Sequence, residues 1–483
     1  MSRSLFAKKS ISALVAEASD TKHALKRTLG PLNLTAMGVG AIIGAGLFVL
    51  TGQAAAAHAG PAIILSFAIA AVICFFSALC YAEFASLIPI AGSAYSYAYA
   101  TMGEFAAWII GWALTLEYLF SSSTVAVGWS AYFVSLLRDF GLVIPTQYCS
   151  APLAYDAVNG WVLSGSVINL PAIFIVAIIG WMISVGIQTA AFVNNLMVII
   201  KLLIIVLFIG CGVVYINWDN LRPFIPENTG VFGQFGWSGV FRGAGIVFFA
   251  FIGFDAVSTL AQEARNPQKD LPTGMLGSLS ISTLIYIIVA VVLLGVVGFS
   301  QLGVPDPIAV AVNALGPNFV WLRYVIKIAI IAGLSSVVLV MLLGQSRILF
   351  TMSQDGLLPK AFGKVHPKFK TPFFTSILIS FIAMIIAGIF PVEILGQLVS
   401  MGTLLAFAIV CLGVLILRRT QPKLHRPFRT PLVPLIPALG VLTCVAQMIV
   451  LPGVTWMQLV GWMVIGFIIY FSFGAKHSVV RNP

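Results

Sequence analysis

Long apolar stretches, separated by short polar segments, make up most of the chain. Twelve of them approach or exceed the roughly 20 residues that an α-helix needs to cross the hydrocarbon core of a bilayer. They lie at about 34–58, 61–88, 103–137, 168–188, 192–216, 237–262, 272–299, 318–352, 373–390, 394–418, 430–450 and 455–474. Lipid offers the backbone no hydrogen-bond partner, so each stretch is predicted to be a helix. The pattern predicts an all-α integral membrane protein with twelve transmembrane helices.

Composition excludes a water-soluble protein. Only 8% of the 483 residues are charged, whereas ordinary soluble domains have about 25%. If the N-terminus is cytoplasmic, 20 of the 26 lysines and arginines fall on the cytoplasmic side, as the positive-inside rule requires. The net charge of +11 therefore indicates topology, with both termini cytoplasmic, and no nucleic acid partner is expected. The N-terminal segment lacks the apolar core of a signal peptide and is predicted to be an amphipathic helix on the membrane surface.

Two interrupted spans divide the chain into similar halves. The first span contains GVGAIIGAG at residues 38–46, and the sixth contains FFAFIGFDA at residues 248–256. Each opens a group of five spans, and because five is odd the second group enters from the opposite face. Two such groups match the inverted repeat of secondary transporters. The expected units are a cytoplasmic segment at 1–33, repeats at 34–216 and 237–418, two additional helices at 430–474 and a cytoplasmic tail at 475–483.

The glycines of the first span suggest a binding site. A helix broken within a membrane persists only where its freed backbone groups line an enclosed cavity. The freed N–H groups at the start of a half-helix suit a carboxylate, and freed carbonyls suit an ammonium. One break in each repeat would hold both ends of a zwitterionic amino acid. The alternative is that these glycines only allow close helix packing, since Gly40 and Gly44 have GxxxG spacing.

Three segments resemble a known family. GVGAIIGAGLFVLTG, FFAFIGFDAVSTLAQEARNPQKDLP and GQSRILFTMSQDGLLPKAFGKVHPKFKTP are similar to segments of the amino acid–polyamine–organocation superfamily. Within it they most resemble bacterial members of the cationic amino acid transporter family, and the similarity runs from about residue 28 to 475. The resemblance implies a leucine-transporter-like fold with broken helices 1 and 6, and amino acid uptake coupled to protons. It also implies a place in the bacterial inner membrane.

The resemblance also implies the substrate contacts. They are Ile42, Ile43, Gly44, Ala45 and Gly46 from the first break, Phe249, Ala250 and Ile252 from the second, and Met341 from helix 8. Ala45 departs from the family pattern, because related sequences often have a serine or threonine there. The departure removes a hydroxyl contact but keeps the backbone donor.

Lys201 is an isolated charge inside the fifth span. Charged groups deep in a bilayer are costly and usually functional. Sodium-coupled relatives of this fold hold the ion between helices 1 and 8 with carbonyls and two hydroxyls, and helix 8 here offers Ser335 and Ser336. A lysine ammonium at that spot would replace the ion and, because burial favours a neutral amine, carry the coupled proton. The alternative is a permanently charged structural ammonium.

Glu117, Asp255 and Glu83 are acidic residues that also fall within spans. Glu117 either pairs with Lys201, faces the pocket to handle substrate or protons, or is a protonated helix–helix contact. Asp255 follows the second break and is interpreted as a cap of the second half-helix. Glu83, near the cytoplasmic end of the second span, is interpreted as structural.

The pocket favours small to medium neutral amino acids. A methionine at 341 fills the space that a long cationic side chain needs, and only Glu117 is available to bind a guanidinium or ammonium. A cationic amino acid transporter, an exchanger and a non-transporting amino acid sensor remain alternatives. No GxxxxGK[ST] or HExxH motif occurs, which argues against an ATP-driven pump and an intramembrane metalloprotease. The histidines and cysteines show no metal-ligand spacing, so no metal or other cofactor is expected.

Overall fold

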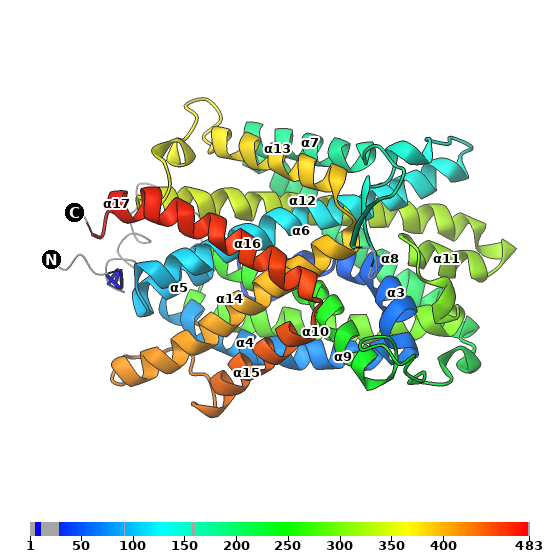
Figure 1. Cartoon of the computed structure of the whole chain (residues 1–483), viewed down its shortest axis with the longest axis horizontal. Coiled ribbons are helices and arrows are strands. Elements are labelled where there is room, and N and C mark those ends of the chain that lie inside the picture. The colour runs from blue at the N-terminus through cyan, green and yellow to red at the C-terminus, as the bar shows by residue number, and fades with distance from the viewer. Residues whose placement is uncertain (1–4, 11–28, 91, 157–159, 262, 482–483) are drawn as a thin grey trace.

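The computed structural model describes residues 5–10, 29–90, 92–156, 160–261 and 263–481 (Figure 1). Long helices run side by side along the longest axis of the molecule, and both termini lie at the same end. In the described part of the chain, eight helices are long and apolar enough to cross a membrane. Four further apolar helices are shorter, namely Pro31–Ile42, Leu170–Val185, Phe373–Ile389 and Leu435–Val450. The chain is therefore a helical membrane protein.

The helices follow the apolar stretches closely. Among the described residues, the first seven are α2 (Pro31–Ile42), α3 (Thr51–Ala54), α4 (Ile63–Leu87), α5 (Ser93–Thr101), α6 (Glu104–Asp139), α7 (Leu170–Val185) and α8 (Ile187–Gly212). They are followed by α9 (Gly236–Val247), α10 (Pro267–Val296), α11 (Pro307–Ala314), α12 (Val320–Gln354) and α13 (Phe373–Ile389). The last are α14 (Val392–Thr420), α15 (Leu435–Val450), α16 (Gly453–Ile469) and α17 (Ala475–His477).

Three details differ from the sequence prediction. The span predicted from residue 430 begins only at Leu435, because Pro431 and Pro434 cannot donate backbone hydrogen bonds. The segment between the second and third spans contains the buried helix α5. The loop before α7 forms an antiparallel hairpin of β1 (Leu153–Asp156) and β2 (Gly160–Leu163). The predicted amphipathic helix of the N-terminal segment falls largely at residues 11–28, outside the described residues.

Close helix packing accounts for part of the glycine motif. A Cβ atom added to Gly38 would lie 2.6 Å from Cβ of Ser278 on α10, and one added to Gly40 would lie 2.7 Å from Val198 on α8. These two glycines let α2 approach its neighbours. The packing interpretation therefore applies to the part of the motif that stays helical.

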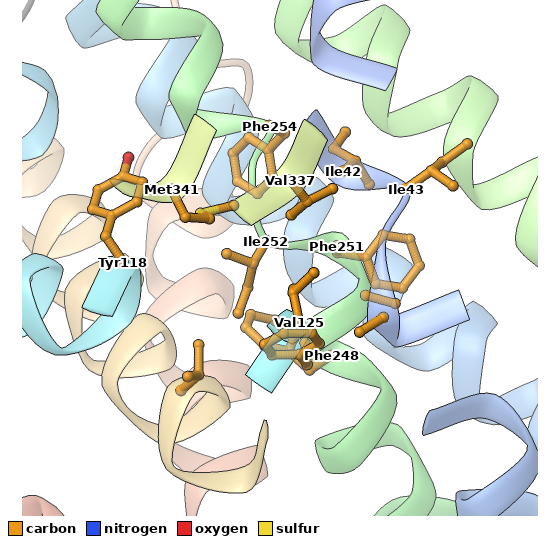
Figure 2. Close-up of a cluster of buried hydrophobic side chains, with 14 of the residues drawn as sticks. Ile42, Ile43, Tyr118, Val125, Phe248, Phe251, Ile252, Phe254, Val337 and Met341 are labelled. Carbon is orange, nitrogen blue, oxygen red and sulfur yellow. The ribbon is translucent and has the colours of Figure 1, made fainter. Parts of the chain in front are cut away.

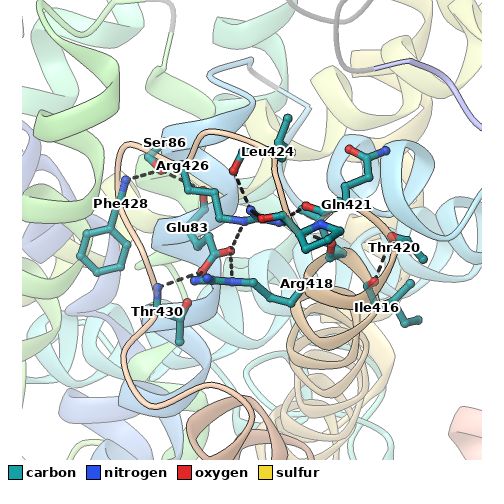
Figure 3. Close-up of polar contacts among 12 residues, drawn as sticks. Glu83, Ser86, Ile416, Arg418, Thr420, Gln421, Leu424, Arg426, Phe428 and Thr430 are labelled. Carbon is teal, nitrogen blue, oxygen red and sulfur yellow. Dashed lines mark hydrogen bonds and ion pairs between the residues drawn. The ribbon is translucent and has the colours of Figure 1, made fainter.

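A buried ion cluster holds the loop after α14 against the end of α4 (Figure 3). The carboxylate of Glu83 is fully buried and accepts two hydrogen bonds from Arg418, of 3.0 and 2.8 Å. Arg426 Nε lies 3.0 Å from the same carboxylate, and the N–H of Thr430 donates to it at 2.8 Å. Arg426 also donates to carbonyls at the C-terminal end of α14, including that of Gln421 at 2.9 Å. The geometry supports a structural interpretation of Glu83.

Replacing Glu83 with glutamine should destabilise the protein without altering the central site. The change leaves two arginines near the buried position without their counter-charge, so we expect a loss of about 3 kcal/mol in the free energy of unfolding. Thermal unfolding of the purified protein in detergent measures the effect. Glu227→Gln, at an exposed loop position, is the matched control and should be neutral. Equal stability of the two variants would contradict the prediction.

Both chain ends pack on the end of the molecule that carries α5 (Figure 1). The N–H of Glu104 donates to the carbonyl of Ala7 at 3.0 Å, and Lys9 forms a 3.0 Å ion pair with Asp355. The buried carboxylate of Glu104 accepts hydrogen bonds from Tyr470 at 2.9 Å and from Ser478. Residues 5–10 and the C-terminal tail therefore join helices from both halves of the chain.

Candidate functional site

The first transmembrane helix is interrupted after α2. Ile43 has an extended backbone, with φ −74° and ψ 109°, and a wide π-helical turn follows at Gly46–Leu50. Among the described residues, the N–H groups of Gly44 and Ala45 donate to no carbonyl outside the regular helices. These two donors lie at the start of the second half-helix, where the first N–H groups have no partner within the helix and the helix dipole is positive.

The second break follows α9. The chain tightens into a 3₁₀ turn at Phe248–Phe251, and Ile252 is extended, with ψ 134°. Gly253 has φ +115°, a conformation that favours glycine. A Cβ atom at Gly253 would lie 3.0 Å from the carbonyl of Ala41, so the second break fits directly against the first.

The two breaks are held together by glycine and by tyrosine. A Cβ atom added to Gly46 would lie 2.3 Å from Cα of Ala250, a distance that no side chain tolerates. The hydroxyl of Tyr286, on α10, lies 2.6 Å from the carbonyl oxygen of Ala250 and 3.0 Å from that of Ile42. Nothing in the sequence distinguished this tyrosine from the chain's other aromatic residues.

A cavity of about 10 Å³ lies between the breaks. It is lined by Ala41, Ile42, Gly44, Ala45, Gly46, Ser121, Val125, Phe249, Ile252, Val337 and Met341. Figure 2 shows the apolar side chains of Val125, Ile252, Val337 and Met341 gathered in this region. A space of this size holds about one water molecule. Side chains must therefore move before an amino acid can occupy it.

Seven of the nine contacts that the resemblance implies line this cavity, and two of them, together with the alternative contact Glu117, do not. The three outside it are Ile43, Ala250 and Glu117. Ile43 and Ala250 direct their carbonyls to Lys201 and Tyr286 instead. The sequence prediction missed Val125 and Val337, which lie on α6 and α12 without any local motif.

Lys201 on α8 is fully buried and directs its ammonium group at the end of α2. Its Nζ atom donates to the carbonyl of Gly40, to that of Ile43 at 2.9 Å and to Oγ of Ser336 at 3.3 Å. Three acceptors match the three N–H donors of an ammonium. Gly333 gives the lysine stem room, because a Cβ atom there would lie 2.9 Å from Cβ of Lys201.

Ser335 does not join Ser336 at this ammonium. Its hydroxyl accepts a hydrogen bond from Nε1 of Trp129 at 2.9 Å and donates to the carbonyl of Ile331 at 2.8 Å. Successive residues of a helix point about 100° apart, and here the two adjacent hydroxyls point to different neighbouring helices. The structure thus brings Lys201 and Ser336 together but leaves Ser335 on the face toward α6.

Glu117 is fully buried one helical turn from the cavity-lining Ser121. Neither of its carboxyl oxygens has a hydrogen-bond partner among the described residues, and no ion pair joins it to Lys201. Asp255 accepts hydrogen bonds of 3.3 Å from the Tyr118 hydroxyl and from the N–H of Gly253. Asp255 thus binds the backbone just before the second half-helix.

Nothing in the described ranges suggests a resident metal. No three histidine, cysteine, aspartate or glutamate side chains there lie close enough to share an ion. The site that the geometry offers is a small apolar cavity with backbone N–H groups and carbonyls at one side, and an ammonium bound nearby. Such a site can bind the two charged groups of an amino acid zwitterion. It can also discriminate between amino acids by the size of their side chains.

Comparisons with known proteins identify relatives that are membrane transporters. The family model described as amino acid permease matches residues 29–473. A branched-chain amino acid permease of Bacillus subtilis is 44% identical over 483 residues, the whole of both chains. The methylthioribose transporter of the same organism is 43% identical over 99% of this chain and 100% of its own. The vacuolar cationic amino acid transporter 4 of Arabidopsis thaliana is 34% identical over 87% of this chain and 68% of its own.

Proposed function

The chain belongs to the amino acid permease family of membrane transporters and is not an enzyme, and from that premise we propose that it is a proton-coupled symporter. Its substrates are small to medium neutral L-amino acids, which cross by alternating access. Lys201 carries the coupled proton. The observation behind the coupling is the buried ammonium of Lys201, which donates to the carbonyl of Ile43 just after α2 and to Ser336 on α12.

The proposed topology has twelve crossings with both termini in the cytoplasm. The first crossing consists of α2 and the residues after its break, and the other eleven begin with α4, α6, α7, α8, α9, α10, α12, α13, α14, α15 and α16. Two inverted five-helix repeats span 34–216 and 237–418. Support comes from the paired breaks after α2 and α9 and from the shared end of the two termini. The charge bias of the loops assigns that end to the cytoplasm. The end that carries α11 then faces outward.

The substrate is held at its charged ends by backbone. Its carboxylate accepts from the free N–H groups of Gly44 and Ala45, and its ammonium donates to carbonyls beside the breaks, such as that of Ile42. The side chain lies against Val337 and Met341, which suit an apolar group. The name of the Bacillus branched-chain permease agrees with such a substrate. An exchanger and a carrier of cationic amino acids, suggested by the name of the Arabidopsis relative, are the competing functions.

Uptake into proteoliposomes tests this function. An inward proton gradient without sodium should drive accumulation of one or more neutral amino acids. Counterflow, in which unlabelled internal substrate drives entry of labelled substrate, separates a transporter from a sensor. Accumulation that requires sodium at constant pH would contradict proton coupling, and counterflow without any response to pH would indicate an exchanger.

Met341→Ser should widen substrate selection. The change removes most of a side chain that bounds a cavity of about 10 Å³, so longer and cationic amino acids should gain affinity by roughly tenfold. Competition of all twenty amino acids against a labelled substrate measures the change. Met457→Ser, on an exposed face of α16, is the matched control. A competition profile identical to that of the parent would remove Met341 from the pocket.

A further inference from the structure

A second cavity lies farther along the same two broken helices. Its volume is about 270 Å³, near the lower end of the range of about 300–1,000 Å³ typical of small-molecule sites. It is lined by Leu50, Gln53, Ala54, Ala56, Ala57, His58, Ile246, Gly303 and Glu393. Leu50 lies one turn beyond Gly46, and Ile246 one turn before Phe249, so the two cavities are neighbours. With the proposed topology, this larger cavity is on the outer side.

Three polar side chains line this cavity, those of Gln53, His58 and Glu393, and each carries an atom that can accept a hydrogen bond. Nδ1 of His58 lies 2.7 Å from the carbonyl oxygen of Gly233, which only accepts, so Nδ1 carries the proton. The other ring nitrogen, Nε2, lies 3.9 Å from Oε1 of Glu393 and is an acceptor in the neutral form of the ring. Oε1 of Gln53 is buried without a donor among the described residues.

Side chains from two further positions fix the carboxylate. Gln397 donates to Oε1 of Glu393 at 3.3 Å, and Thr455 donates to Gln397 at 3.3 Å. The Glu393 side chain is 53% exposed, so a ligand can reach it from water. Arg242 is the neighbouring positive charge, and its guanidinium lies over the ring of Phe232 rather than on the carboxylate. Small residues form much of the remaining wall and leave the space open.

We propose that this outer cavity is a loading subsite that binds the α-ammonium group of an arriving amino acid. Glu393 accepts from the ammonium together with Oε1 of Gln53 and Nε2 of His58. The subsite binds amino acid zwitterions in preference to carboxylic acids that lack an amine. The bound amino acid then moves to the central cavity past the turn between Leu50 and Gly46. The proposal rests on the proposed function, because that function defines the outer side and the substrate class.

The test compares Glu393→Gln with the parent chain, both reconstituted at full length, with L-leucine as the probe. Removing the carboxylate charge should raise the KM for external leucine about tenfold. The equilibrium Kd of the central site in detergent should stay unchanged. L-leucinol keeps the ammonium but lacks the carboxylate, so it should inhibit uptake by the parent about tenfold better than uptake by the variant. 4-Methylpentanoic acid, which lacks the amine, should inhibit neither.

Two controls keep the outcome interpretable. Glu227→Gln, at an exposed loop position, should match the parent in KM and in inhibition by leucinol. Gln53→Met removes another proposed acceptor of the subsite and should also raise the KM for external leucine. It tests the proposal if Glu393→Gln fails to fold. Unchanged KM and unchanged leucinol inhibition in both Glu393→Gln and Gln53→Met would overturn the subsite while leaving the proposed function intact. A parent chain that neither binds nor transports leucine or any other neutral amino acid would overturn both.

Discussion

Lys201→Ala should abolish proton-driven accumulation. With one proton carried per substrate, an outside pH one unit lower supports about a tenfold concentration ratio. The parent should approach that ratio and the variant should stay at equilibration, because the substitution removes the amine that is proposed to bind and release the proton beside α2 and α12. Uptake of a labelled neutral amino acid into proteoliposomes under an imposed pH gradient measures both values.

Two further variants distinguish the effect of the positive charge at residue 201 from the effect of its ability to release a proton. Lys201→Arg keeps a cation that does not deprotonate in proteins, so it should bind substrate but fail to accumulate it. Lys269→Ala removes an exposed lysine and should behave as the parent. Accumulation by Lys201→Ala at the parental level would show that the buried ammonium is only structural.

Gly46→Leu should abolish substrate binding. The Cβ atom of a side chain at this position would lie 2.3 Å from Cα of Ala250. The two breaks must separate, which displaces the N–H groups of Gly44 and Ala45. Scintillation proximity binding of a labelled neutral amino acid should fall below detection.

Gly461→Leu is the matched control for this substitution. It places the same side chain at a glycine of α16 with no atom within 4 Å of its Cβ position. Both variants should elute as monodisperse protein in size-exclusion chromatography, and only Gly46→Leu should lose binding. Parental affinity in a well-folded Gly46→Leu would mean that substrate binds elsewhere.

The sequence predicted the spans because a bilayer requires about 20 apolar residues and self-satisfied backbone. It predicted interruptions near residues 38–46 and 248–256 from the glycines of the first motif and from the corresponding place of the second motif in its group of five spans. Both motifs contain a break in the structure, after Ile42 and after Phe251. Start positions that depend on proline, such as that of α15, were less well predicted.

Side-chain partners could not be predicted in the same way. Lys201 was notable as a charge in a span, yet which of two adjacent serines meets it depends on the rotation of α12. Glu83 binds arginines 335 and 343 residues later in the chain, a pairing that no local pattern encodes. The size of the central cavity likewise depends on how Val125 and Val337 pack across two helices.

The hydroxyl of Tyr286 has one proton and two carbonyls within reach, those of Ile42 and Ala250. It can donate to only one of them at any instant, so one carbonyl of the pair always lacks its donor. A substrate ammonium would donate the missing hydrogen bond to one carbonyl, so that the tyrosine hydroxyl could donate to the other carbonyl alone. Tyr286→Phe would leave both carbonyls unsatisfied in the empty protein. Substrate would then stabilise the variant against heat more than it stabilises the parent.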